Sequence, residues 1–151
     1  MTLAEDLTPE RVLLRLRAAD KPRLLAELGR QAGRALDIDA GEITAALAAR
    51  EALGSTGVGA GIAVPHAALA GVAGTVAFLA RLERPIDFAA IDGQPVDLVF
   101  LLLGPPAGRA EHLAALAAAT RRLRDKATAA ALRAAPSADA MRAAFLAEPA
   151  G

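Results

Sequence analysis

The sequence predicts a single α/β domain, in which a mixed central sheet of about five strands carries helices on both faces. Segments with strand-like and helix-like patterns alternate along the chain, and the run 99–103 is apolar without interruption. In addition, 54% of the 151 residues are hydrophobic and none is cysteine. A chain of this length buries roughly two thirds of its unfolded surface, so we expect one domain over residues 1–151 that needs no disulfide.

The first third of the chain predicts a strand followed by two helices. Residues 12–17 place Val12, Leu14 and Leu16 on one face, as a half-buried strand does. Asp20 opens a helix whose apolar residues fall at helical spacing. Asp39, with Glu42 as an acidic variant of the capping box, opens a second helix that we expect to end at Gly54.

The second third predicts a shaped loop and a set of strands. Residues 54–61 hold four glycines, which favours a loop over any regular element. A short strand over 62–66 is closed by Pro65, because proline cannot donate to a sheet ladder. We expect a longer strand over 72–82, turns over 84–88 and 91–95, and a central strand over 96–103 whose continuous apolar character is typical of a strand covered on both faces.

The last third is predicted to be helical. One helix runs from Arg109 to Arg124, and more helix follows through Leu132 and stops near Pro136. Ser137 caps a last helix.

Charge and composition exclude two classes of partner. The 17 basic residues balance 17 acidic ones, and the chain has four Phe but no Trp or Tyr, so neither a basic footprint nor a base-stacking platform for nucleic acid is present. A secretory leader begins with basic side chains, whereas residues 1–9 carry none. No apolar run approaches the ~20 residues of a membrane span. We therefore expect a cytoplasmic protein without membrane insertion.

Two histidines and one arginine are the candidates for chemistry. His66 follows Pro65 at the end of a strand, and His112 falls in the first turn of the helix 109–124 on its apolar face. Arg50 lies on the inward face of its helix, shortly before the glycine loop, where a guanidinium needs an anionic partner. Helix N-termini and glycine loops present backbone N–H groups to anions, so these parts could form a phosphate site. On the residues alone, the alternative stays open that Arg50 extends to solvent, His112 caps its helix and the glycines form only a turn.

Other glycine and histidine motifs fail on spacing. A phosphate-binding P-loop needs a lysine after its second glycine, and no lysine lies near the loop. A dinucleotide motif opens a helix, whereas residues 57–61 precede a strand. The GxSxG elbow of serine hydrolases is absent, and two histidines with scattered aspartates are too few for a closed zinc site. No metal or other cofactor is expected.

The run 50–66, REALGSTGVGAGIAVPH, resembles the signature of phosphotransferase-system enzyme IIA domains of the mannitol/fructose type, in particular their nitrogen-regulatory branch. Residues 85–96, PIDFAAIDGQPV, are similar to a second block of the family. Residues 101–105 and 111–113 resemble a third. The resemblance extends over essentially the whole chain. It departs at Ala60, where the family often has Asn, and at residues 67–68, where a Gly or basic residue is common.

The resemblance implies a phosphohistidine carrier, a phosphotransferase component, of mixed-sheet α/β fold. His66 would accept a phosphoryl group from the carrier HPr or its nitrogen-branch paralogue, and His112 would be the second active-site histidine. Arg50 would stabilise the phosphate, together with the segment Ser55, Thr56 and Gly57. Downstream, the family implies either a IIB protein, as in sugar transport, or regulatory targets such as potassium-transport proteins or sensor kinases, as in nitrogen regulation.

Three functions remain open at this point. A phosphoryl carrier that acts mainly as a regulator is favoured over a sugar-specific IIA that passes phosphate to a separate IIB. A regulatory binding module that is not phosphorylated is the second reading, and an unrelated enzyme that binds a phosphorylated metabolite is the third.

We expect Val58 and Leu69, more than Ile62, to border the His66 site as an apolar docking ring, since strand aliphatics such as Ile62 are usually core.

Overall fold

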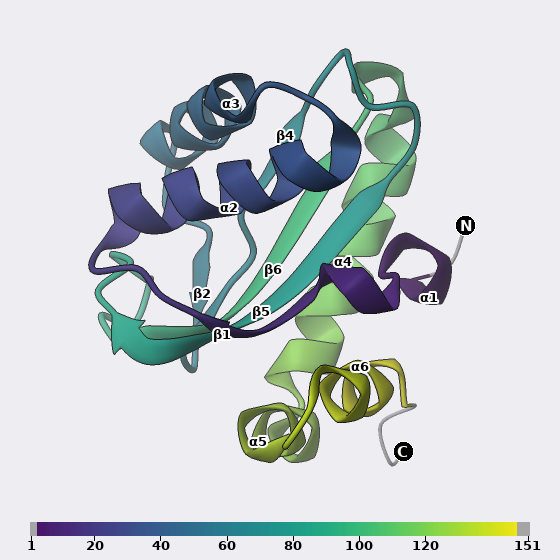
Figure 1. Cartoon of the computed structure of the whole chain (residues 1–151). Coiled ribbons are helices and arrows are strands. Elements are labelled where there is room, and N and C mark those ends of the chain that lie inside the picture. The colour runs from purple at the N-terminus through teal and green to yellow at the C-terminus, as the bar shows by residue number, and fades with distance from the viewer. Residues whose placement is uncertain (1–2, 148–151) are drawn as a thin grey trace.

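The computed structural model describes residues 3–147, which form one mixed six-stranded open sheet with helices on both faces (Figure 1). In chain order the elements are α1 (Leu3–Asp6), η1 (Pro9–Arg11), β1 (Val12–Leu16), α2 (Lys21–Leu36), α3 (Ala40–Ala52), β2 (Gly57–Gly59), β3 (Ile62–Ala63), β4 (His66–Ala68), β5 (Val76–Ile86), β6 (Val96–Gly104), η2 (Pro106–Gly108), α4 (Arg109–Arg124), α5 (Lys126–Ala134) and α6 (Ala138–Leu146). The predicted fold class is confirmed. The short helices α1, η1 and η2 are the helical elements that the sequence did not predict.

The strand order is β1-β5-β6-β3-β2, with β4 also paired to β6. β6 is antiparallel to β5 on one side and parallel to both β3 and β4 on the other. The prediction that residues 96–103 form the central strand is therefore confirmed. β3 and β4 both pair with the same side of β6, so residues 64–65, which separate them, lie beside the central strand.

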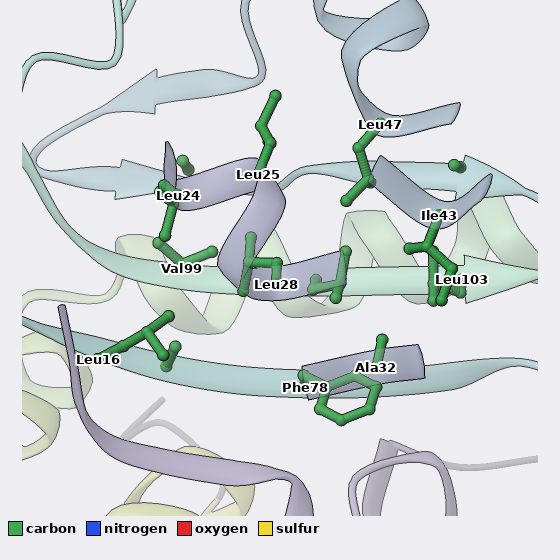
Figure 2. Close-up of a cluster of buried hydrophobic side chains, with 14 of the residues drawn as sticks. Leu16, Leu24, Leu25, Leu28, Ala32, Ile43, Leu47, Phe78, Val99 and Leu103 are labelled. Carbon is green, nitrogen blue, oxygen red and sulfur yellow. The ribbon is translucent and has the colours of Figure 1, made fainter. Parts of the chain in front are cut away.

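Each face of the sheet has its own apolar core. Alternate residues of β6 point to opposite faces, so that Val99, Leu101 and Leu103 join the core under α2 and α3, whereas Leu98, Phe100 and Leu102 join the core under α4, α5 and α6. Figure 2 shows the first of these cores, in which Leu24, Leu28 and Ala32 of α2 and Ile43 and Leu47 of α3 pack with Phe78, Val99 and Leu103 of the sheet. The two cores hold α3 and α4, the helices that carry Arg50 and His112, against the same sheet.

The predicted helix starts are confirmed by their caps. The side chain of Asp20 accepts a hydrogen bond from the backbone N–H of Arg23, and Asp39 accepts one from Glu42. Ser137 caps α6 in the same way. A cap of this kind contributes about 1 kcal/mol, because it satisfies a backbone donor that has no partner within the helix.

The prediction of a loop over 54–61 is wrong for residues 57–59, which form the edge strand β2 antiparallel to β3. The reason is a close approach of two backbones. A Cβ atom built on Gly57 would lie 2.7 Å from the Cβ of Ala90 and 3.2 Å from Cδ1 of Phe88. The glycine permits this approach, and the N–H of Ile91 donates to the carbonyl of Gly57 over 3.1 Å.

The predicted strand over 72–82 and the turn over 84–88 are also corrected. β5 begins at Val76 and continues through Arg84 and Pro85 to Ile86, which pairs with Val96 of β6. Pro85 is exposed and lies where the β5/β6 register shifts, so its missing N–H leaves no regular ladder bond unmade. Proline therefore did not end this strand.

Candidate functional site

His66 is the first residue of β4, not the last residue of a strand as predicted. Pro65 lacks an N–H group, so the strand predicted over 62–66 divides into β3 and β4 around it. The pairing with β6 resumes at once, since the carbonyl of Pro65 accepts from Leu102 N–H over 3.1 Å and His66 lies opposite Leu102. The half-buried imidazole is thus attached to the central strand of the sheet at a break in the ladder.

Both ring nitrogens of His66 have partners of fixed polarity. Nδ1 lies 2.9 Å from the carbonyl oxygen of Val64, which can only accept, and Nε2 lies 3.2 Å from Nε of Arg50, which can only donate. The proton therefore sits on Nδ1, and Nε2 carries the free electron pair. Of the two nitrogens, Nε2 is the one that can act as a nucleophile.

Arg50 reaches His66 from the last turn of α3. Its Nε donates to Nε2 of His66, and its Nη1 donates to the carbonyl of Gly54 over 3.0 Å, just beyond the end of the helix. The sequence expectation was an anionic partner for this arginine. The structure gives it a neutral nitrogen and a carbonyl instead, and so holds a cation directly beside the candidate nucleophile.

His112 lies beside the His66 ring. Its ring centroid is 5.4 Å from that of His66, with the two planes tilted by 57°. His112 comes from the first turn of α4, as predicted, and its Nδ1 lies only 3.2 Å from where a Cβ on Gly104 would be. Gly104, at the end of β6, therefore leaves the room that the second imidazole occupies.

Burial lowers the pKa of both histidines below the ordinary value of 6.5. For His66, desolvation is the largest cause; the hydrogen bond to Val64 raises its pKa, the positive charge of Arg50 lowers it, and the negative charge of Glu51 raises it. For His112, desolvation comes first and the neighbouring His66 adds to it. Both rings are consequently neutral at pH 7, which is the form that a nucleophile or a neutral hydrogen-bond donor requires.

The three residues predicted to bind phosphate hold the loop together in this structure. The Ser55 hydroxyl donates to the carbonyl of Phe88 and accepts from Gly57 N–H, each over 3.1 Å. Thr56 is buried, and both its N–H, at 3.0 Å, and its hydroxyl donate to the carboxylate of Glu51. Gly57 belongs to β2 and packs on Ala90. The structure thus brings His66, His112 and Arg50 together, whereas the hydrogen bonds of segment 55–57 hold the adjoining loop in place.

Glu51 and Lys21 are the residues of this region that sequence reasoning missed. Nζ of Lys21 lies 2.8 Å from the Glu51 carboxylate, whose side chain is only 5% exposed, and 4.4 Å from the centre of the Phe88 ring. One signal was available in the sequence. An acidic residue in the last turn of a helix opposes the helix dipole, so Glu51 at that position indicates a dedicated partner.

Ile62 is fully buried, which confirms the expectation that it belongs to the core, and Val58 and Leu69 are partly buried against the two cores. Their place in an apolar docking ring stays a prediction. Among the described residues, the large hydrophobic side chains exposed to solvent are Leu53, Ile91 and Leu113. Leu53 follows Arg50 at the end of α3 and Leu113 follows His112 on α4, so two of these three border the candidate site along the chain.

Within residues 3–147, no group of three or more His, Cys, Asp or Glu side chains is arranged to hold a metal ion. No helix in that same range is long and apolar enough to cross a membrane.

Comparisons with known proteins agree on one family. Residues 5–148 match the model for "Phosphoenolpyruvate-dependent sugar phosphotransferase system, EIIA 2". The chain is 43% identical over 141 residues to the nitrogen regulatory protein of Bradyrhizobium diazoefficiens, covering 93% of this chain and 92% of that one. It is 35% identical to the nitrogen regulatory protein IIA-Ntr of Neisseria meningitidis, whose crystal structure superposes with a TM-score of 0.89 over 93% of this chain and 97% of that one. The fold also matches mannitol IIA of Escherichia coli in its complex with phosphorylated mannitol IIB, with a TM-score of 0.75 at 22% identity over 90% of this chain and 94% of that one.

Proposed function

The chain belongs to the EIIA 2 family of the phosphoenolpyruvate-dependent sugar phosphotransferase system, and on that premise we propose that it is a cytoplasmic phosphohistidine carrier. His66 accepts a phosphoryl group from HPr or its nitrogen-branch paralogue. The observation that carries the proposal is the hydrogen bonding of His66, which leaves the free electron pair on Nε2 beside the Arg50 cation. A ring arranged in this way places the nucleophilic nitrogen next to the positive charge of Arg50, which can stabilise the negative oxygens of a phosphoryl group.

In the transfer step, Nε2 of His66 attacks phosphorus in line with the breaking P–N bond of the donor phosphohistidine. The electron pair of the broken bond returns to the donor ring, whose other nitrogen carries a proton, so the donor leaves as neutral imidazole. The His66 ring takes on the positive charge and keeps its proton on Nδ1, where the Val64 carbonyl accepts it. No proton has to move for the phosphoryl group to change rings.

Arg50 and His112 supply the charge and the positioning. The guanidinium loses its bond to Nε2 when that atom is phosphorylated, and its N–H groups then face the phosphoryl oxygens. His112, neutral and 5.4 Å away ring to ring, presents an N–H to the same oxygens. Ser55, Thr56 and Gly57 support the reaction indirectly, because their hydrogen bonds fix the loop beside the site.

Downstream, we propose that the phosphorylation state of His66 is read by regulatory partner proteins, such as potassium-transport proteins or sensor kinases. This is favoured because relatives that match more than nine tenths of this chain bear the name nitrogen regulatory protein. Transfer to a separate IIB protein is the alternative. The mannitol IIA of the same fold is seen with a phosphorylated IIB, and a fructose-specific EIIA component of Haloferax volcanii is 42% identical over 99 residues.

The test is intact mass spectrometry after incubation with phosphoenolpyruvate, enzyme I and either HPr or its paralogue. We expect one acid-labile phosphoryl group on the wild type and none on His66→Gln, whereas His112→Gln still gains it, more slowly. A wild-type chain that gains no mass with either donor would leave the unphosphorylated binding module as the function. Phosphorylated and unphosphorylated forms, immobilised in parallel, then report whether a IIB protein or a regulatory target distinguishes them.

A further inference from the structure

Two neighbouring residues at the end of α3 act on the two different nitrogens of His66. Arg50 contacts Nε2 directly. Glu51 reaches the Nδ1 side through a chain of backbone contacts: its carboxylate accepts from Thr56 N–H at 3.0 Å, the Thr56 carbonyl accepts from Val64 N–H at 3.0 Å, and the Val64 carbonyl accepts from Nδ1–H of His66 at 2.9 Å. One helix end thus controls both sides of one imidazole.

Glu51 is held where it is by Lys21, at the start of α2. The carboxylate is 5% exposed and the lysine side chain 20% exposed, and Nζ lies 2.8 Å from Oε1 of Glu51. Burying a carboxylate is costly unless it is paired and hydrogen-bonded. Lys21 and the two donors of Thr56 meet that requirement, so the negative charge persists inside the protein close to His66.

We propose that Glu51 is a positioning residue for His66, which together with Lys21 keeps the proton on Nδ1 both before and after phosphorylation. The proposal rests on the phosphocarrier function above. Before transfer, the fixed Val64 carbonyl keeps the proton on Nδ1 and so leaves Nε2 free to attack. After transfer, Nε2 is blocked and Nδ1 is the only ring nitrogen that can hold a proton.

The second effect sets how readily the phosphoryl group leaves again. A ring protonated on Nδ1 departs as neutral imidazole when the P–Nε2 bond breaks, whereas an unprotonated ring would have to depart as imidazolate, which is a far worse leaving group. The negative charge of Glu51 stabilises the protonated ring, in opposition to the positive charge of Arg50. Glu51 therefore keeps phospho-His66 in its transferable form.

The charged and titratable groups around His66 are few. Arg50 and Glu51 come from α3 and His112 from α4, and Lys21 of α2 acts through Glu51. Glu51→Gln keeps the size of the side chain and can still bond Thr56, but it removes the charge. Glu83→Gln is the matched control, because Glu83 pairs with Arg17 on the surface. His66 and Ala77 both lie opposite Leu102 of β6, and Glu83 is six residues further along β5 than Ala77. Glu83 is therefore about 20 Å from His66.

The first experiment needs no phosphorylation. Nitrogen-15 NMR of unphosphorylated protein follows the titration and tautomer of His66. In Glu51→Gln we expect a lower pKa for His66 than in the wild type and a detectable fraction of the Nε2–H tautomer, with no change in Glu83→Gln. Unchanged titration and tautomer in Glu51→Gln overturn the proposal, even where the chain proves not to be a phosphocarrier.

The second experiment uses the phosphorylated protein. The acid limb of phosphoryl loss from His66, whether to water or back to the donor, should shift to lower pH in Glu51→Gln, and transfer at pH 7 should slow by about tenfold, the effect of losing one charge-assisted interaction. Glu51→Gln alone leaves the Lys21 ammonium without its carboxylate partner, which could destabilise the fold. The double variant Lys21→Met/Glu51→Gln removes both charges, so it tests the effect of Glu51 on His66 in a folded chain. If the double variant is as stable as the wild type but its pH profile of phosphoryl loss is still shifted, Glu51 is a positioning residue for His66. If its pH profile equals that of the wild type, Glu51 has no such role.

Discussion

Nε of Arg50 lies 3.2 Å from Nε2 of His66, so the ring nitrogen that carries the free electron pair is also the one held by a permanent cation. This contact aligns the imidazole before a donor arrives. It also lowers the pKa of His66, in addition to the larger lowering by burial.

Arg50→Ala should slow phosphoryl transfer to His66 by about a hundredfold, the loss typical of removing one preorganised donor to a developing oxyanion. Arg50→Lys should recover only part of the rate, because an ammonium group cannot bond Nε2 and the Gly54 carbonyl as a guanidinium does. Single-turnover transfer from phosphorylated donor measures both. Arg34→Lys, on the exposed last turn of α2, is the control, and equal rates for all four proteins would remove Arg50 from the mechanism.

Gly104→Ala should slow transfer several-fold by displacing His112. The new Cβ would lie 3.2 Å from Nδ1 of His112, closer than side chains normally pack, so the second imidazole has to move away from His66. The same change at Gly71, where a Cβ meets only ordinary contacts at 3.6 Å, is the control. NMR of the His112 ring together with transfer rates reports the result; a displaced ring with an unaltered rate would show that His112 takes no part.

Acid should destabilise the fold through both histidines. Their folded-state pKa values lie below the 6.5 of the unfolded chain, so the unfolded state binds protons first. Their contribution to the free energy of unfolding is complete above pH 6.5 and is lost as the pH falls from there through the lowered folded-state values. Urea titrations across this window measure it. The double variant His66→Gln/His112→Gln should show a shallower slope, and an identical slope would contradict the assignment.

Ala60→Gly should stabilise the protein by about 0.5–1 kcal/mol, because relief of left-handed strain exceeds the added entropy of the unfolded chain. Ala60 has φ of +58°, in the region that favours Gly and Asn. The same backbone conformation also favours Asn, so Ala60→Asn should stabilise as well.

Ala48→Gly is the matched control for this pair, since it makes the same change at an exposed position inside α3. There we expect a loss of roughly 1 kcal/mol. Urea unfolding of the three variants tests both signs, and a loss of stability at position 60 as large as that at position 48 would refute the strain argument.

Leu53→Ala and Leu113→Ala should weaken docking of the donor without affecting the fold. Leu53, which follows the last residue of α3, is 84% exposed, and Leu113, which follows His112 in α4, is 53% exposed, so neither contributes much to the core. Combining the two substitutions should raise the apparent KM for the phosphorylated donor about tenfold at an unchanged kcat. Ile91→Ala, at an equally exposed position on the 87–95 segment, should leave the KM unaltered, and a KM effect confined to Ile91→Ala would move the docking surface there.

Much of this fold was predictable because its signals are local. Asp20, Asp39 and Ser137 begin helices through bonds to residues three positions ahead. The unbroken apolar run in β6 predicted a strand covered on both faces. The errors fell where a distant partner decides the outcome. Residues 57–59 form a strand because Gly57 allows the segment 88–91 to pack against it, and Pro85 stays in β5 because the register shifts around it.

The sequence by itself determined the order of the longer helices and of the central strand, the family signature and the candidates His66, His112 and Arg50, since each of these depends on residue type at short spacing. Only the tertiary structure decided which nitrogen of His66 is free, that Glu51 and Lys21 are linked to this ring through Thr56 and Val64, and that the two imidazoles lie side by side because Gly104 leaves room for His112. These relations join four separate helices and strands to one ring. Their geometry exists only once both cores have packed against β6, and no spacing along the chain encodes it.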